Sequence, residues 1–512
     1  MHREKRLTTY GRNLLLAALC ASAASQAAEA PVSAGFLYHQ YGLTLEPGRR
    51  TEALGPFWAS EETWPEGAVP AGTDPWDATP PVTQVARNFT LAPLFSWTAD
   101  AKTERVSWDL VYPIITYDQY GSEYRFQVFQ LLSFSGGATQ AGAKGRGFSL
   151  IPFFWFRRSA EDPSLNYTAV WPFYGTLQQR LFRDEIKFVL WPFYAQTRKR
   201  DVVTDNYLVP FGHARHGDGL RGWQIWPFYG TEHKDITTRT DGFGDTRTIP
   251  GHDKRFVLWP FYFRNDMEIG STNPVTQRVL FPFYSFQRSP QKDRDTYLWP
   301  FGVTIVDDRE LKYRQTSVLW PIITLAHGEG KQAVKIWPFY GDTRFANARN
   351  VLVLWPIYFQ RDSLREPLEE HSTRIAFFVY TDITRKNRDT GQVSRRSDFW
   401  PLFIARRDMD GNERFQLLAP IEPVLSDNPS LNRLYSPIWS LWRSARNAKT
   451  GAVSRSFLWN LYRYDATPQS KKCSLLFGLI QYHSDPGGKR WRFLYLPSGK
   501  RRAPPPEPAR TR

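Results

Sequence analysis

Clustered His, Asp and Glu side chains are the first place to look for chemistry in this chain. His213, His216 and Asp218 lie close together beside Gly217 and Gly219, and imidazole and carboxylate groups at such spacing can hold a metal ion. Glycine next to aspartate is also typical of a tight turn, and a polar hairpin tip explains these residues more simply. We therefore predict no metal site here.

Two acidic clusters carry the residue types used for glycan hydrolysis, in which one carboxyl group is the acid and a second is the base or nucleophile. They are Asp307-Asp308 with Glu310, and Glu369-Glu370. Both lie in polar stretches with arginines nearby, so a solvated surface is the simpler interpretation. The sequence contains no Gly-x-Ser-x-Gly, His-Glu-x-x-His, P-loop or dinucleotide-binding motif. We predict a protein that is not an enzyme and that uses no cofactor.

Tryptophan and arginine are the remaining candidates for function. Tryptophan rings stack on sugars, so a regular row of them suits a glycan; the simpler interpretation is that each ring packs against its counterpart in the next repeat. Arginines beside the predicted strands and in the tail are candidate contacts for an acidic glycan or another anion, with a solvated strand end as the alternative. These candidates are Arg198, Arg200, Arg264, Arg406, Arg407, Arg501 and Arg502.

A repeated aromatic motif dominates the chain and must position any such site. Trp-Pro occurs nine times in the segment 171–401, usually within Leu-Trp-Pro-Phe-Tyr, and related units extend the series from Pro93 to Pro437. A spacing of about twenty residues indicates a repeat architecture. Ser133 and Phe378 mark two degenerate copies of the motif, at the two places where the spacing between prolines doubles.

Each repeat has the composition of a β-strand followed by a turn. β-branched and aromatic residues surround every proline, and Gly, Asn and Asp fill the intervals, with Asp410-Gly411 as a clear hairpin signal. Proline in nearly every unit excludes long helices. We predict an all-β protein, an antiparallel meander of about twenty strands with one strand per repeat. Proline cannot donate a ladder hydrogen bond, so either a shared kink or a motif at each strand start must accommodate it.

The side-chain pattern around one proline suggests how these strands pack. Between Lys187 and Gln196 both faces of the predicted strand are apolar near Pro192, and the flanks are polar and basic. We therefore expect strand centres that are buried on both sides. An outer-membrane-type barrel, a propeller and a soluble meander or solenoid all provide such burial. We favour the barrel because it fits the repeat length and the aromatic content.

The first residues have the pattern of an export signal. Residues 1–27 combine a basic start, an apolar stretch from Leu14 to Ala24 and a small-residue cleavage site at Ser25-Gln26-Ala27. Beyond this segment Cys473 is the only cysteine, so no intrachain disulfide can form. We predict a protein exported to the outer membrane or periplasm of a Gram-negative bacterium, where nucleic acid is not a partner.

The remaining boundaries follow the repeats and the charge. Residues 28–87 lack the repeat and are predicted to form an N-terminal cap or arm, residues 88–498 form the repeat domain, and 235–254 is its longest loop. Residues 499–512 form a basic, Pro-rich tail, which we expect to be disordered, in a chain of net charge +16. The tail either docks on anionic envelope components or keeps the protein soluble.

The tandem pattern resembles a group of exported bacterial proteins with LWPFY-type β repeats. It is intact at Leu190–Tyr194 and Leu258–Tyr262, and the resemblance covers about residues 88–497. It implies location and architecture, and no activity. We predict a non-enzymatic protein of the cell envelope, associated with the outer membrane and with a structural, transport or polymer-handling role. The alternative is a soluble periplasmic or surface module that binds acidic glycan or lipopolysaccharide; a glycan-active enzyme is the least favoured reading.

Overall fold

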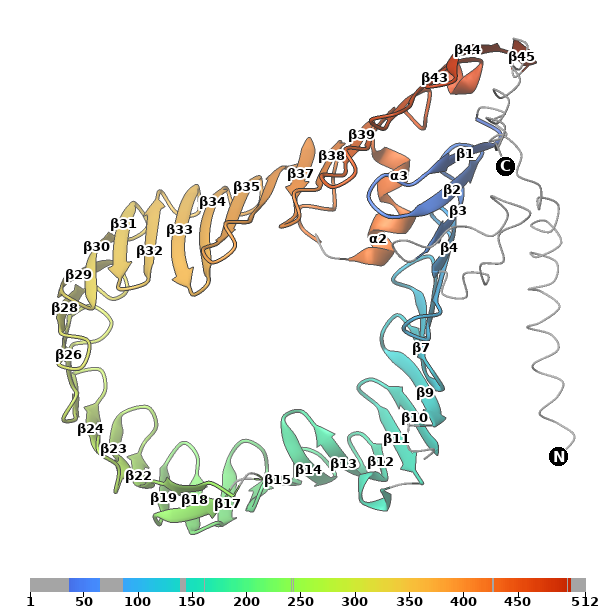
Figure 1. Cartoon of the computed structure of the whole chain (residues 1–512). Coiled ribbons are helices and arrows are strands. Elements are labelled where there is room, and N and C mark those ends of the chain that lie inside the picture. Colours follow the sequence, from blue (N-terminus) through green and yellow to red (C-terminus); the bar gives the residue numbers. More distant parts are fainter. Residues whose placement is uncertain are drawn as a thin grey trace, which may run out of the picture.

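One antiparallel β-sheet of 43 strands makes up most of the part of the chain that the structure describes (Figure 1). The computed structural model describes residues 36–64, 86–138, 144–160, 162–240, 242, 244–425, 428–494 and 496–498. The predicted signal peptide, 1–27, and the tail, 499–512, lie outside these residues. Among the described residues, no helix has both the length and the apolar character needed to cross a membrane.

The strands follow one another around the sheet in sequence order. The first part contains β1 His39–Gly42, β2 Gly48–Ala53, β3 Trp58–Thr63, β4 Ala86–Leu91, β5 Phe95–Asp100, β6 Arg105–Leu110, β7 Ile115–Tyr120, β8 Glu123–Val128, β9 Leu132–Ala138, β10 Lys144–Leu150, β11 Phe154–Ser159, η1 Pro163–Leu165, β12 Tyr167–Val170, β13 Tyr174–Arg180, β14 Arg183–Val189 and β15 Tyr194–Lys199. The middle part contains β16 Val202–Tyr207, β17 Gly212–Gly217, β18 Leu220–Ile225, β19 Tyr229–Lys234, β20 Thr237–Thr240, β21 Thr246–Ile249, β22 Gly251–Val257, β23 Tyr262–Ile269, β24 Val275–Leu280, β25 Tyr284–Arg288, β26 Lys292–Tyr297, β27 Val303–Asp308, β28 Tyr313–Val318, β29 Ile323–Gly328 and β30 Lys331–Ile336. The last part contains β31 Tyr340–Phe345, β32 Ala348–Val353, β33 Tyr358–Arg365, β34 Leu368–Ile375, β35 Tyr380–Asn387, β36 Val393–Phe399, β37 Phe403–Arg407, β38 Glu413–Leu417, α2 Pro429–Leu434, α3 Ser436–Trp439, β39 Trp442–Arg446, β40 Val453–Phe457, β41 Tyr462–Ala466, β42 Lys471–Leu475, η2 Leu476–Gly478, β43 Ile480–Asp485, β44 Gly488–Phe493 and β45 Leu496–Ser498.

The all-β antiparallel meander is confirmed, but each repeat supplies two strands. The motif is the turn between them: β14 ends at Val189, β15 starts at Tyr194, and these two residues pair across the turn Leu190–Phe193. Two predictions were therefore wrong, namely about twenty strands and a motif at a doubly buried strand centre. The physical reason is that proline weakens a ladder but fits a turn.

Hydrogen bonds hold each turn and join it to its neighbours. In the turn Leu190–Phe193 the Trp191–Pro192 peptide is cis, and the Phe193 N–H donates to the Leu190 carbonyl at 2.8 Å. The Trp191 N–H donates to the carbonyl of Pro172 in the preceding turn at 2.6 Å. The turns thus form a continuous border along one edge of the sheet.

We call this border the Trp-Pro rim. Its proline-containing turns are centred on Pro56, Pro93, Pro113, Pro152, Pro172, Pro192, Pro210, Pro227, Pro260, Pro282, Pro300, Pro321, Pro338, Pro356 and Pro401.

Of the two degenerate copies of the motif, one was placed correctly from the sequence and one was not. Phe378 lies in a rim turn, at 376–379, as expected. Ser133 lies in β9 instead, and the rim turn of that repeat is formed by residues 129–131. Pro437 is no repeat proline, because it lies in helix α3, within an insertion between β38 and β39. Its spacing of 17 residues from Pro420, which suggested a further repeat, is coincidental.

The opposite edge of the sheet carries the polar turns. Asp410-Gly411 and Asp218-Gly219 connect strands there, as the sequence predicted, and Gly328–Gly330 forms a further turn at this edge. The segment 235–254, predicted as a loop, instead contains the separate two-stranded hairpin of β20 and β21 and the start of β22.

The sheet curls so that its two ends overlap (Figure 1). Strands β1–β3 lie within the predicted N-terminal cap, yet they pair into the main sheet. Among the described residues, β1 pairs only with β2 and β45 only with β44, so the ends do not join by strand pairing. They instead face each other with α2 and α3 between them, and we call this region the ring junction.

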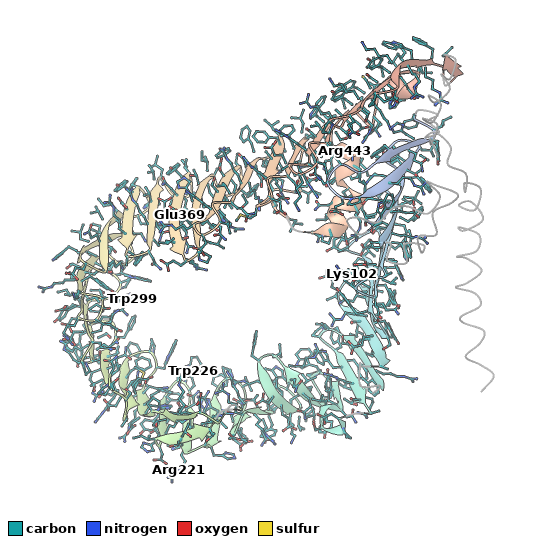
Figure 2. All side chains as sticks on the ribbon, viewed as in Figure 1. Lys102, Arg221, Trp226, Trp299, Glu369 and Arg443 are labelled. Carbon is teal, nitrogen blue, oxygen red and sulfur yellow. The ribbon has the colours of Figure 1, made fainter. Side chains whose placement is uncertain are left out.

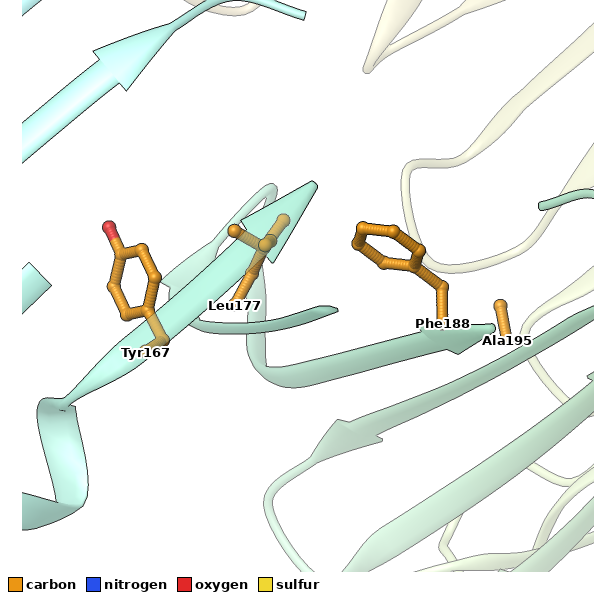
Figure 3. Packing of buried hydrophobic residues seen from close by; sticks show 5 residues of the cluster. Tyr167, Leu177, Phe188 and Ala195 are labelled. Carbon is orange, nitrogen blue, oxygen red and sulfur yellow. The ribbon is translucent and has the colours of Figure 1, made fainter. Parts of the chain in front are cut away.

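The two faces of the sheet differ in exposure. Alternation places Tyr167, Leu177, Phe188 and Ala195 on one face, where they form a small buried cluster (Figure 3). The same face of both end sections points into the ring junction, so this is the inner face of the ring. Figure 2 agrees, because Trp226 points into the ring and Arg221, on the other face, points outward.

Candidate functional site

The Trp-Pro rim exposes large apolar side chains all around the ring. In the turn Leu190–Phe193, Leu190 is 55% exposed and Phe193 is 64% exposed, and Phe301 in a later turn reaches 78%. The same tip positions are exposed in other repeats at Phe153, Phe173, Leu208, Phe228, Leu258, Phe261, Phe283, Leu298, Phe339, Leu354 and Ile357. Soluble monomers rarely leave apolar surfaces of this extent uncovered, which makes the rim a candidate contact site.

Polarity rises step by step from the rim into the strands. On the outer face of β15, Tyr194 adjoins the turn and is followed by Gln196 and Arg198. The corresponding second outer position carries charge in many strands, at Lys187, Asp205, Arg255, Arg264, Arg278, Asp295, Asp342 and Asp382. The apolar border is therefore shallow, about the depth of the turn and one strand residue.

Tyrosines bridge the apolar and polar levels. The Tyr358 hydroxyl donates to Gln360 at 2.9 Å, and the Tyr380 hydroxyl donates to Asp382 at 3.2 Å. Each partner lies two residues further from the rim on the same face. The ring thus stays beside the turn while the hydroxyl points to the polar level, which is the amphipathic arrangement of aromatic residues at membrane surfaces.

The tryptophans of the Trp-Pro turns lie along the inner side of the rim. Ring centroids of Trp299 and Trp320 are 5.9 Å apart, and those of Trp337 and Trp355 are 5.7 Å apart. Packing against the counterpart in the next repeat is thus confirmed. Trp320 is nevertheless 50% exposed, and Trp226 and Trp299 point into the ring (Figure 2). The rim is apolar on both its inner and outer sides.

The arginines predicted from the sequence do not form one site. Arg198 pairs with Glu185 at 3.0 Å, Arg264 lies 3.6 Å from Asp266, and Arg200 occupies the polar turn after β15. Arg406 and Arg407 are neighbours on β37 and point to opposite faces. Arg501 and Arg502 lie outside the described residues.

The acidic and histidine clusters do not assemble into catalytic or metal sites. Asp308 is buried on the inner face, 3.0 Å from Lys292, whereas Asp307 points outward. Glu369 and Glu370 also point to opposite faces and pair separately with Arg388 and Arg385. His213 and His216 are three residues apart on β17, hence on opposite faces, and no group of three metal-ligating side chains occurs in the described part of the chain.

The ring junction contains a second organised set of polar groups. Glu52 is buried; it accepts hydrogen bonds from the Tyr41 hydroxyl and from Arg50, both at 2.8 Å, and one from Asn460 at the other end of the chain. The Arg463 guanidinium lies 3.3 Å from the centre of the Tyr41 ring. Burial raises the pKa of Glu52, but Arg50, Arg443 and Arg463 outweigh it and lower that pKa to about 2.

The helical insertion completes this junction. The Tyr435 hydroxyl donates to the Tyr112 carbonyl at 2.9 Å, and Asn428 donates to the Tyr112 hydroxyl at 2.7 Å. Leu434 of α2 is fully buried. No local sequence signal links residues so far apart, so the junction escaped prediction. The turns of the rim also escaped it, although the proline in every repeat was an available signal for them.

Comparison with known proteins does not assign the chain to a family. The sequence matches no protein-family model and no curated protein.

Proposed function

We propose that this protein is a membrane-attached β-ring of the bacterial envelope, whose Trp-Pro rim dips into one leaflet and holds the ring on the membrane surface. Its role is structural: it encloses a patch of membrane within the ring. The observation that carries the proposal is the shallow border that is apolar on both sides and is followed by tyrosines and then by charge.

The depth of this border favours one leaflet over the whole bilayer. A turn and one strand residue reach roughly 5–10 Å, the depth at which interfacial segments bury their apolar face. Transmembrane strands need about 9–11 residues with an apolar outer face, whereas the strands here have three to eight residues. Charged residues such as Arg264 and Arg278 already occupy the second outer position.

The side chains on the inner side of the rim also support insertion into one leaflet. A water-filled barrel needs a polar lumen, but tryptophans such as Trp226 and Trp299 face inward at the rim (Figure 2). A rim dipped into a leaflet meets lipid on both sides, so inward tryptophans are then favourable. The predicted export signal and the net charge of +16 suit attachment to an envelope membrane with anionic lipids.

Flotation with lipid vesicles tests this proposal. The full-length protein should float with phosphatidylcholine vesicles, and more strongly when phosphatidylglycerol is added. The double variant Phe193→Asp/Phe301→Asp should partition at least about tenfold more weakly, because two exposed apolar anchors are replaced by charge.

The chain offers a matched control for these variants. Phe182 is the more exposed aromatic, at 97%, but it lies in a turn on the polar edge. Phe182→Asp should float like the unmodified protein. Loss of flotation with Phe182→Asp, or a stable rim-to-rim dimer that ignores vesicles, would contradict membrane attachment by the rim.

A further inference from the structure

A cavity of about 440 Å³ lies in the ring junction, between the two ends of the sheet. Tyr41 and Arg50 of the first strands line one wall, and Arg406, Arg414 and Arg443 of the last strands line the other. Helices α2 and α3 contribute Asn432 and Ser436. The cavity has the volume of a small-molecule site and is built from segments nearly the whole chain apart.

Positive charge predominates in this cavity. Five arginines line it, namely Arg50, Arg406, Arg414, Arg443 and Arg463, against two glutamates, Glu46 and Glu61. Several acidic groups around them already have partners: Glu52 and Glu61 pair with Arg50 at 2.8 Å and 3.1 Å, and Asp465 pairs with Arg463 at 2.7 Å. Arg406, Arg414 and Arg443 bring positive charge to the cavity from the C-terminal strands.

The strand register concentrates this charge. Arg396, Arg406 and Arg414 lie directly opposite one another on β36, β37 and β38, all on the inner face. The buried carboxylate of Asp398 pairs with Arg396 at 2.5 Å, at one end of the row. Like charges directly opposite each other destabilise a sheet, so an anion bound at the other end of the row would offset this repulsion.

We propose that the cavity binds an acidic saccharide unit of one or two rings. Its phosphate or carboxylate lies between the guanidinium groups of Arg406, Arg414 and Arg443, which match planar or tetrahedral oxyanions. Its hydroxyl groups meet polar side chains of the lining such as Ser456 and Asn432. The proposal does not depend on membrane attachment, because the cavity belongs to the ring junction and not to the rim.

Titration calorimetry with the full-length protein tests this site, using glucose 6-phosphate, glucuronate and glucose as probes. Saturable binding of an acidic sugar, weakened by added salt, with no binding of glucose, is the expected result. The tighter of the two acidic sugars then identifies phosphate or carboxylate as the preferred anion. Failure of both acidic sugars to saturate, or equal binding of glucose, would overturn the proposal.

Matched arginine variants locate the binding. Arg414 is exposed and makes no hydrogen bond or ion pair with the described residues, so Arg414→Gln should fold normally, which a melting curve checks. Arg414→Gln and Arg406→Gln should each weaken binding about tenfold, as expected for loss of a charge-assisted hydrogen bond. Arg407→Gln, on the outer face of β37, should bind like the unmodified protein. An equal loss with Arg407→Gln would place the anion elsewhere and refute the site.

Discussion

Asn460 donates a hydrogen bond to Glu52 across 408 residues of sequence, and this contact joins the two ends of the ring. Both side chains are buried, and Glu52 also accepts from Tyr41 and Arg50. Closure of the ring therefore rests on side-chain contacts between facing strands. Aromatic pairs add to it, with Phe57 and Trp459 at 5.6 Å between ring centroids.

Removing this hydrogen bond should loosen the ring junction. Asn460→Ala leaves a buried carboxylate with one partner fewer, so the free energy of unfolding should fall by about 1–3 kcal/mol. Hydrogen exchange should become faster in β2 while the strands of the middle part keep their protection. The control is Glu62→Gln on the outer face of β3, whose exposed ion pair with Arg49 should contribute less than about 1 kcal/mol. Equal effects of the two variants would contradict the assigned role of Asn460.

Acid should weaken the same junction in two steps. Burial and Arg463 lower the pKa of His39 from 6.5 to about 4. Between these two pH values the unfolded chain therefore binds a proton on His39 that the folded chain does not bind. The contribution of His39 to the free energy of unfolding is fully present above pH 6.5 and is lost as the pH falls towards 4. Glu52 adds a second loss between pH 4.5 and about pH 2, because its pKa is lowered in the fold.

Melting temperatures measured against pH separate these contributions. The variant His39→Gln should remove most of the slope between pH 6.5 and pH 4 and leave the more acidic step in place. A slope that is unchanged in His39→Gln would show that other groups control the acid response.

We expect Asp308 to stabilise the folded protein and to have no part in glycan cleavage. Burial raises its pKa, but the Leu311 N–H and Lys292 lower it below the usual range, and those partners lie 2.9 Å and 3.0 Å away. Asp308→Asn should lower the free energy of unfolding by about 1–3 kcal/mol, whereas Asp307→Asn on the outer face should change it by less than about 0.5 kcal/mol. Denaturant titration measures both. Loss of a glycan-cleaving activity in either variant would revive the enzymatic hypothesis.

A protein bound by its rim should leave the membrane sealed. We expect dye-loaded vesicles to retain their contents after the protein binds, because the inward tryptophans and short strands do not form a polar channel. Dye release at the same protein-to-lipid ratio, or stepwise conductance in a planar bilayer, would instead support the transmembrane barrel.

The fold class followed from composition, whereas strand number depended on reading the proline correctly. Alternation placed Val189 and Tyr194 in one strand, although they are paired residues on two strands separated by a four-residue turn. A proline that cannot donate in a ladder was the available signal. Turns such as Asp410-Gly411 were predicted correctly because glycine tolerates their positive φ.

The parts that escaped prediction depend on contacts between distant residues. Pro437 appeared to continue the repeat, but it lies in a helix that packs at the ring junction. Neither the Glu52–Asn460 contact nor the row of Arg396, Arg406 and Arg414 has a local signature. Each arises from the curvature and the register of the whole sheet.

Tryptophan fluorescence in vesicles with brominated lipids tests the central claim most directly. Rim tryptophans such as Trp299 and Trp320 should be quenched strongly by bromine near the headgroups and weakly by bromine near the bilayer centre. Deep quenching equal to shallow quenching, or no quenching at either depth, would contradict a rim that dips into one leaflet.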